Sequence, residues 1–309
     1  MSKQGSKPGA DKVHRAGHGA GKANCAGPDA EEKIRRPRER FLPAIEYVRR
    51  YGNEREKEAL RLLFEPGPPS PTVVRELFSG ELPQGGWTYP GCEIGSVNET
   101  LWRITQALEI GLDAGHPAMM SALSFLLRVQ NADGSWVEDA RLASKCPPWA
   151  APGRPATTLY LTSSAAYVVA ILMGTSLPET RRASNCLSAM LESEGRLPSY
   201  LHTHWLAAGL WWKTGERDLV DRVIGYLRSR LGPDTPTNHL SWAAVTLLDA
   251  GLPSENPFVQ LLLDLLEARQ SEDGHFDAED GEAWFAHSTW EALKAFAMEG
   301  RLFEATSQA

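Results

Sequence analysis

The chain reads Gln130-Asn131-Ala132-Asp133-Gly134-Ser135-Trp136 where one apolar segment ends, and it repeats the pattern as Gln270-Ser271-Glu272-Asp273-Gly274-His275-Phe276. Each copy closes an apolar run with helical spacing, Leu123 to Val129 and Val259 to Ala268. The Asp-Gly pair predicts a turn, because glycine supplies the positive φ that the end of a helix needs. The glutamine can bond freed helix-end groups, and the aromatic ring can cover the helix end. The two copies therefore predict a repeated helix–turn unit.

This pattern of glutamine, aspartate, glycine and an aromatic residue after a helix resembles the repeat of the terpenoid-cyclase and protein-prenyltransferase superfamily. The resemblance covers about residues 80–303. It implies an all-α fold, an α/α toroid whose helix pairs are arranged in a ring, like the squalene–hopene cyclase repeats. Full-length triterpene cyclases have two such barrels, whereas a chain of 309 residues has room for one.

Two kinds of helix alternate along the chain. Segments that begin near residues 98, 162, 202, 238 and 287 are rich in Ala, Leu and Trp and poor in charge. The segments between them, 117–129, 179–192, 217–231 and 256–268, have one apolar stripe. A helix that is apolar all round is buried, whereas an amphipathic helix faces solvent on one side. The alternation predicts an inner and an outer ring of about five to six helix hairpins, with the N-terminal helical region supplying the sixth.

Composition divides the chain into one domain and two tails. Residues 1–39 are rich in Gly, Lys, Ala and Ser and are predicted to be a disordered basic tail. Residues 40–303 are predicted to form the toroid domain, and residues 304–309 a C-terminal tail. A net charge of −7 argues against nucleic acid as a partner. We find neither a long uninterrupted apolar run nor an apolar N-terminal signal core, so we expect no transmembrane segment and a cytoplasmic location.

The first turns of the predicted inner helices concentrate polar residues. If these helices run parallel, their first turns meet at one mouth of a central cavity, where the helix dipoles direct partial positive charge. Three interpretations are open: helix capping and core packing, a polar cluster that binds a ligand, or a metal site. Zinc is the candidate metal, with ligands from three helices and a fourth from a loop. The residues concerned are Asn98, Glu99, His202, His204, Asn238, His239 and His287, with His204, His239 and His287 as metal ligands and Asp277, Asp280 or Cys92 to complete the set.

The resemblance implies two catalytic templates, and the chain departs from both. Class II terpenoid cyclases carry Asp-x-Asp-Asp-Thr at the start of an inner helix, and the central carboxylic acid protonates an alkene or epoxide. Here the segment is Ser96-Val97-Asn98-Glu99-Thr100, so Asn98 stands at the donor position and Glu99 is the candidate acid, buried with a raised pKa. Protein prenyltransferases hold zinc with Asp-x-Cys and a histidine on the next inner helix. His287 matches the histidine element, but the preceding helix start, with candidate catalytic residue His239, has neither Asp nor Cys.

Tryptophans are frequent on the predicted inner helices. Aromatic faces stabilise carbocations by roughly 0.5–2 kcal/mol per contact, and they also fill cores. We expect an aromatic-lined central cavity suited to a small apolar substrate or lipid. The candidate substrate-binding residues are Trp102, Trp205, Trp242, Trp290 and His202.

Three functions fit these observations. The first is a terpenoid cyclase-like or prenyltransferase-like enzyme that acts on an isoprenoid or other apolar substrate by acid or metal assistance. The second is a non-catalytic scaffold of the same fold that binds a lipid or a protein partner. The third is a histidine-liganded metalloenzyme with non-terpenoid chemistry. Sequence does not identify the substrate, and it leaves zinc as a possible cofactor.

Overall fold

The computed structural model describes residues 36–304. In this part of the chain all regular structure is helical apart from isolated bridges, one of which joins Pro37 to Phe303. The backbone N–H of Arg38 also donates to the carbonyl of Leu302 at 2.9 Å, so the two ends of the described segment pair with each other. Most of the predicted tails, residues 1–35 and 305–309, lie outside the described residues.

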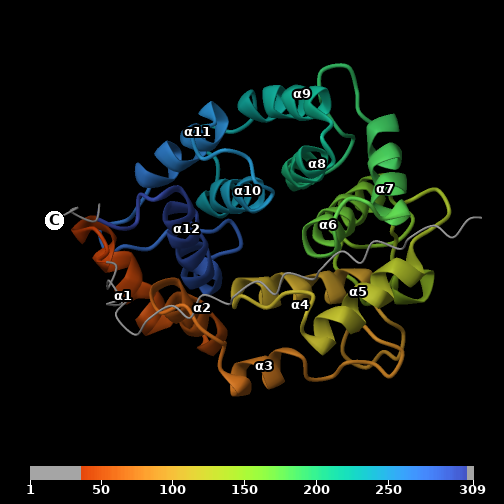
Figure 1. The fold of residues 1–309 in the computed structure, drawn as a ribbon, viewed down its shortest axis with the longest axis horizontal. Coiled ribbons are helices and arrows are strands. Elements are labelled where there is room, and N and C mark those ends of the chain that lie inside the picture. Colours follow the sequence, from red (N-terminus) through yellow and green to blue (C-terminus); the bar gives the residue numbers. More distant parts are fainter. Residues whose placement is uncertain (1–35, 305–309) are drawn as a thin grey trace, which may run out of the picture. The chain divides into compact units, whose positions relative to one another are not determined.

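The helices form two concentric rings (Figure 1). The inner helices are α2 (Glu54–Phe64), α4 (Val97–Glu109), α6 (Pro155–Met173), α8 (Leu201–Thr214), α10 (Thr237–Asp249) and α12 (Phe285–Glu299). The outer helices are α1 (Leu42–Tyr51), α3 (Pro71–Leu77), α5 (Pro117–Val129), α7 (Pro178–Ala189), α9 (Arg217–Arg228) and α11 (Pro257–Glu267). Short 3-10 helices also occur: Glu39–Phe41 precedes α1, Ala140–Leu142 lies in the α5–α6 loop, and Glu282–Trp284 precedes α12. The predicted all-α toroid of helix hairpins is confirmed.

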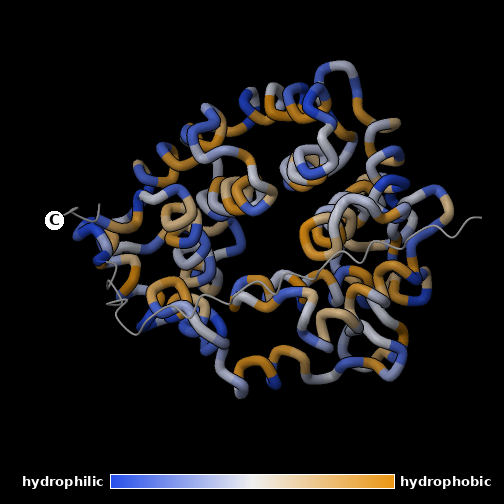
Figure 2. Tube along the Cα trace, in the orientation of Figure 1, coloured by the Kyte–Doolittle hydropathy of each residue, from blue (hydrophilic) through white to orange (hydrophobic). Residues whose placement is uncertain are grey.

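Burial follows the hydropathy pattern that predicted the two rings, and Figure 2 shows this hydropathy along the chain. In α6 every residue from Leu161 to Ala170 is buried. In α9 the buried residues are Val220, Val223, Ile224 and Leu227, which form one stripe of an otherwise exposed helix. By length and composition α6 could cross a membrane, but 67% of its apolar window is buried inside the fold, as in a core helix. The expected lack of a transmembrane segment and the cytoplasmic location both stay predictions.

The glycines of the two repeats join successive outer helices. A Cβ atom added to Gly134, which has a φ of 90°, would lie 2.4 Å from the carbonyl oxygen of Arg182 in α7. A Cβ atom on Gly274, with a φ of 94°, would lie 2.3 Å from the carbonyl carbon of Pro43 in α1. Only glycine permits such close approach of two backbones at positive φ. The turn after α11 therefore packs directly on α1 and closes the outer ring.

A hydrogen bond also joins the turn that follows an outer helix to the next inner helix in four of the hairpins. The turns after α3, α5, α7 and α11 each direct one backbone N–H at a side chain in the first half of the next inner helix. The bonds are Trp87 N to Thr100 Oγ1 at 3.0 Å, Trp136 N to Thr162 Oγ1 at 3.0 Å, Leu197 N to His204 Nε2 at 2.9 Å and Phe276 N to Thr289 Oγ1 at 2.9 Å. His204 thus occupies the structural position that threonine occupies in the other three repeats.

Helix α4 differs from the other inner helices in direction. In Figure 1, α8 and α10 are seen nearly end-on, whereas α4 lies across the view. The C-terminal residue of α4, Glu109, forms an ion pair with Arg55 of α2, and its Oε1 lies 4.0 Å from Nε2 of His287 in the first turn of α12. The end of α4, and not its start, therefore meets the first turns of its neighbours. The expectation that all inner helices open onto one mouth was wrong for α4.

Candidate functional site

A group of aromatic rings and imidazoles joins the first halves of α6, α8 and α10. The ring of His202 lies 4.6 Å from that of Tyr160 and stacks at 5.2 Å on Trp242, measured between centroids. Trp205 lies 5.4 Å from Trp242 and 5.8 Å from His239. We call these five residues the first aromatic group. Four of them, His202, Trp205, His239 and Trp242, are sequence-predicted site residues that the fold does bring together.

Several buried polar atoms of the first aromatic group have no hydrogen-bond partner in the described part of the protein. His202 Nε2, Trp205 Nε1 and His239 Nδ1 make no hydrogen bond within residues 36–304. Burial, with smaller contributions from the nearby imidazoles of His239 and His204, lowers the pKa of His202 to about 3. The His202 imidazole is therefore neutral at pH 7, with one ring nitrogen available to a ligand.

A second aromatic group lies where α4 meets α12. Trp102 of α4 packs 5.8 Å from Trp284 and 6.5 Å from His287, and His287 lies 6.0 Å from Trp290. Burial, with a smaller contribution from the positive charge of Arg55, lowers the pKa of His287 to about 3. The indole N–H of Trp290 has no acceptor in the described part of the protein. Trp102, Trp290 and His287 are thus predicted site residues that lie together, separate from those on α8.

A carboxyl group joins α12 to α10 on the face of α12 that also carries His287. Glu291 of α12 accepts a hydrogen bond of 2.7 Å from Ser241 of α10, the residue before Trp242. Burial raises the pKa of Glu291 to about 7, although the Ser241 bond and the charge of Lys294 oppose the shift. Lys294 itself forms an ion pair of 2.9 Å with Asp249 of α10.

Our sequence analysis missed Glu291. The available signal was an acidic residue four positions after His287, hence on the same helix face, in a segment otherwise rich in Ala, Phe and Trp.

The start of α4 does not join the histidines. Glu138, which is 2% exposed, accepts hydrogen bonds from Ser96 Oγ at 2.7 Å and from the backbone N–H of Asn98 at 2.7 Å, and so caps α4. Burial raises the pKa of Glu99, and Arg103 opposes the shift. Glu99 lies roughly 15 Å of helix rise from Glu109 but only one turn before Trp102, whose ring is 6.5 Å from that of His287. Asn98, held by Glu138, lies beside the α5–α6 loop.

The predicted zinc site of His204, His239 and His287 is not assembled. Both ring nitrogens of His204 are occupied: Nε2 accepts from Leu197, and Nδ1 lies 3.0 Å from the carbonyl oxygen of Tyr200. Its ring stacks at 4.7 Å on Tyr226 of α9, so it faces the outer ring. Neither Cys92, Asp277 nor Asp280 completes a set, because residues 36–304 contain no group of three His, Cys, Asp or Glu side chains that could hold a metal ion. The sequence correctly placed His204 in the first turn of α8, but its ring faces the outer helices and not the interior.

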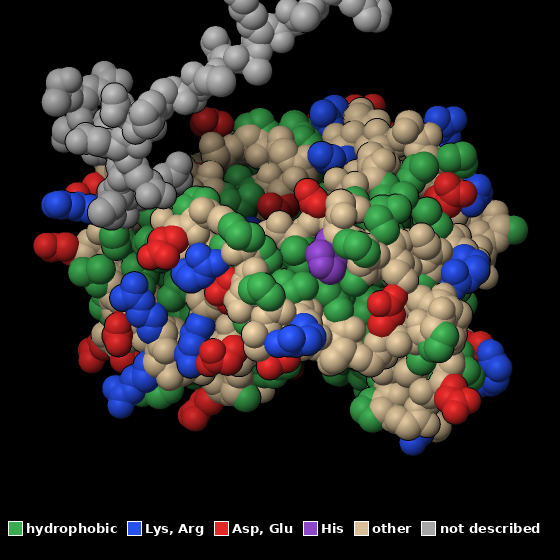
Figure 3. Space-filling model, turned by 60° about the horizontal axis from the view of Figure 1, so that its bottom comes forward, with side chains coloured by type: hydrophobic (Ala, Val, Ile, Leu, Met, Phe, Trp, Pro, Cys, Tyr) green, Lys and Arg blue, Asp and Glu red, His purple; other side chains and the backbone are tan. Residues whose placement is uncertain are grey.

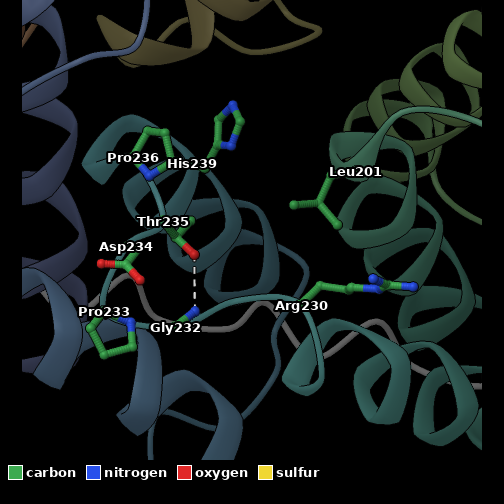
Figure 4. A pocket seen from close by; sticks show the side chains of 8 residues that line it. All are labelled: Leu201, Arg230, Gly232, Pro233, Asp234, Thr235, Pro236 and His239. Atoms are coloured by element: carbon green, nitrogen blue, oxygen red, sulfur yellow. Dashed lines mark hydrogen bonds between the residues drawn. The ribbon is translucent and has the colours of Figure 1, made fainter.

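A pocket of about 350 Å³ opens beside the first aromatic group (Figure 4). Leu201 of α8 and His239 of α10 line it from two inner helices, and Arg230 and the α9–α10 loop line the rest. The Nε2 atom of His239 lies 2.8 Å from Glu279 Oε1 in the loop before α12.

On the face drawn in Figure 3, acidic and basic side chains are interspersed among hydrophobic ones, and a histidine is visible near its middle.

Comparisons with solved structures identify the fold. The type II terpene cyclase MstE from Scytonema, without ligand, matches with a TM-score of 0.55 and 14% identity over 84% of this chain and 97% of that one. An MstE variant in complex with geranylgeranyl dihydroxybenzoate matches with a TM-score of 0.52 and 14% identity, over 85% and 88%. A protein from Actinoplanes matches with a TM-score of 0.52 and 14% identity, over 84% and 89%. No protein-family model and no curated protein sequence matches the chain. The ring of helices is therefore a terpenoid cyclase-like fold of the kind found in type II terpene cyclases.

Proposed function

We propose that this protein is a terpenoid cyclase-like enzyme that binds an isoprenoid chain inside the inner ring and starts its conversion by protonating a carbon–carbon double bond. The fold it shares with MstE, which binds a geranylgeranyl compound, supports the class of ligand. The observation that carries the proposal is the composition of the inner helices, where tryptophans and imidazoles from α4, α8, α10 and α12 form two aromatic groups and the Glu291 carboxyl joins α12 to α10.

Several of these side chains lie as the walls of an internal space would. Tyr160, His202, His287 and Glu291 each keep some accessible surface. Nevertheless, burial is the largest influence on the pKa of each one, which it raises to about 12 for Tyr160 and lowers to about 3 for both histidines. A side chain that protein surrounds and that still keeps some accessible surface is expected to face an interior hollow. An aromatic-lined hollow of this kind suits an apolar chain.

The chemistry needs no group beyond a proton donor, aromatic faces and a base. The π electrons of a double bond take the proton and leave a tertiary carbocation, which a second double bond of the same chain can attack. The tryptophan faces stabilise each cation by about 0.5–2 kcal/mol per contact. Loss of a proton from carbon to a neutral imidazole, such as His202 with its free Nε2, restores a double bond. Protons balance, and the product is an isomer of the substrate.

Incubation of the purified protein with a panel of isoprenoids tests the proposal. The panel consists of geranylgeraniol, farnesol and geranylgeranyl dihydroxybenzoate, and mass spectrometry after chromatographic separation detects isomers of unchanged mass. We expect at least one compound to yield a cyclic isomer at a rate well above the protein-free control. Binding of the panel without any isomer would instead favour the non-catalytic lipid scaffold, which the substitution of Asn98 for an acid at the family's donor position makes the second candidate.

A further inference from the structure

We infer that Glu291 of α12 is the group that presents an acidic proton to a ligand inside the ring. The assignment rests on the proposed function for its substrate class, but it concerns a residue on a different helix from the start of α4, where the family motif lies. It follows from the position of Glu291 on the same face of α12 as His287, from its hydrogen bonding and from the surrounding charges.

Position favours Glu291 first. Its helix also carries His287 and Trp290, and its partner Ser241 is adjacent in sequence to Trp242. The four-residue spacing places Glu291 on the same face of α12 as His287, and the bond to Ser241 joins this face to α10. Glu99 lies instead in the first turn of α4, one turn before Trp102.

Hydrogen bonding leaves one oxygen of Glu291 for the ligand. The Oγ of Ser241 lies 2.7 Å from Oε2 and 3.2 Å from the carbonyl oxygen of Asn238, so Oε1 is the carboxyl oxygen that bonds to no protein group within residues 36–304, and we assign the acidic proton to it. No other side chain or backbone group of residues 36–304 bonds to this carboxyl. Burial disfavours the charged form of a carboxyl group, which keeps a fraction of Glu291 protonated at neutral pH. Glu99 differs because Arg103, one turn away, favours its carboxylate form.

The charges near Glu291 fit both halves of a proton transfer. When the Oε1–H bond breaks, its electron pair stays on the carboxylate and the proton forms a C–H bond with the alkene carbon. The carboxylate then faces the carbocation, and their attraction in a partly desolvated site is strong. Lys294, held by Asp249 at 2.9 Å, lies close enough to stabilise the carboxylate until solvent returns a proton.

A pair of ligands that differ only in charge tests the inference without knowledge of the substrate. One is a geranylgeranyl chain that ends in a dimethylammonium group, which imitates the carbocation. The other is the neutral isostere with carbon in place of nitrogen. Quenching of tryptophan fluorescence at pH 8 measures both affinities. We expect the wild-type protein to bind the ammonium at least about tenfold more tightly than the isostere, and Glu291→Gln to bind the two equally.

The matched control is Glu99→Gln, which removes the other partly buried carboxyl with a raised pKa and should retain the preference. A preference that survives Glu291→Gln, or a wild-type protein that shows none, overturns the inference. Glutamine has the shape of the neutral acid and can accept the Ser241 bond, so we expect the variant to fold, and its melting temperature checks this.

Turnover separates the two proposals. If a panel compound reacts, Glu291→Gln should slow the reaction by about 10²–10⁴-fold, the usual contribution of a general acid, and an unchanged rate would refute the role of Glu291. A charge preference that depends on Glu291, without turnover of any panel compound, supports the interior acid and refutes the proposed function.

Discussion

His202 and His204 lie two residues apart on the first turn of α8 and have opposite surroundings. His204 accepts a backbone hydrogen bond from Leu197 and stacks on Tyr226 of the outer ring. His202 stacks on Trp242 of the next inner helix, and its Nε2 has no protein partner. The outward faces of the first turns hold the repeat turns in place, whereas the inward faces carry polar groups that the fold does not use.

This difference separates structural residues from candidate functional ones. A polar residue that recurs at the same structural position in successive repeats, as Thr100, Thr162, His204 and Thr289 do, satisfies a backbone N–H of the fold. A buried polar atom without a partner costs about 1–3 kcal/mol, so groups such as His202 Nε2 indicate a role beyond stability. Four variants test this division, beginning with the largest expected effect.

Gly274→Ala should cause the largest loss of stability of the four variants, because it disrupts a backbone contact on the outward side. Its Cβ atom would collide with the backbone of Pro43 and Ala44 in α1, in addition to the strain of a positive φ. We expect a loss of about 4 kcal/mol in the free energy of unfolding, measured by denaturant titration. The control is Gly281→Ala, at a φ of 93° with no atom near the added Cβ, which should cost only the backbone strain of about 1–3 kcal/mol. Equal losses for the two variants would show that the contact with α1 does not close the ring.

Glu291→Gln should change how the free energy of unfolding depends on pH, because it removes an ionisable group from the inward side. Burial raises the pKa of Glu291 from its ordinary value of 4.5 to about 7 in the fold, in a site that Ser241, Lys294 and Asp249 share. As pH rises through this window the unfolded chain loses the proton first, so the wild-type protein loses stability, and the loss is complete above pH 7. The gain of Glu291→Gln over wild type should therefore grow by about 2–3 kcal/mol between pH 5 and pH 8.

Denaturation curves at both pH values measure that gain. A constant difference between the two proteins would mean that Glu291 is charged in the fold throughout this range.

His204→Ala should have a smaller effect. The substitution leaves the backbone N–H of Leu197 unsatisfied in a buried position, which costs about 1–3 kcal/mol. Thermal denaturation followed by circular dichroism measures the loss. Zinc affinity should not change, because His204 has no free nitrogen, and a loss of zinc binding on this substitution would restore the metal hypothesis.

His202→Phe should have the smallest effect on stability and sharpens the comparison within one turn. Phenylalanine keeps the ring contacts with Tyr160 and Trp242 and removes a nitrogen that the fold leaves unpaired. We expect a change within about 1 kcal/mol. A loss as large as that of His204→Ala would place both histidines among the structural residues.

The sequence was sufficient for the architecture because the information is local. A glycine after a helix, an aromatic residue two positions later and alternating apolar and amphipathic segments each reflect short-range physics, and together they predicted the ring of hairpins. Two further repeat turns, with Gly85 and Gly195, are degenerate, and only the structure shows their equivalence.

The candidate site was less predictable because it depends on relative helix orientation. Nothing in Ser96–Thr100 reveals that α4 lies across the direction of α8 and α10, so Asn98 and Glu99 were grouped with the histidines of those helices. The face on which His204 lies follows from its bond to Leu197, a contact with the preceding turn. The spacing from His287 places Glu291 on one face of its helix, but its bond to Ser241 depends on the packing of α12 against α10, which the spacing does not encode.

A crystal structure of the protein with the geranylgeranyl dimethylammonium ligand tests the central claim most directly. We predict that the chain lies inside the inner ring against Trp242 and Tyr160, with the ammonium group in contact with the carboxylate of Glu291. A ligand bound only in the pocket beside Arg230 and Asp234, with side chains filling the ring, would contradict the account.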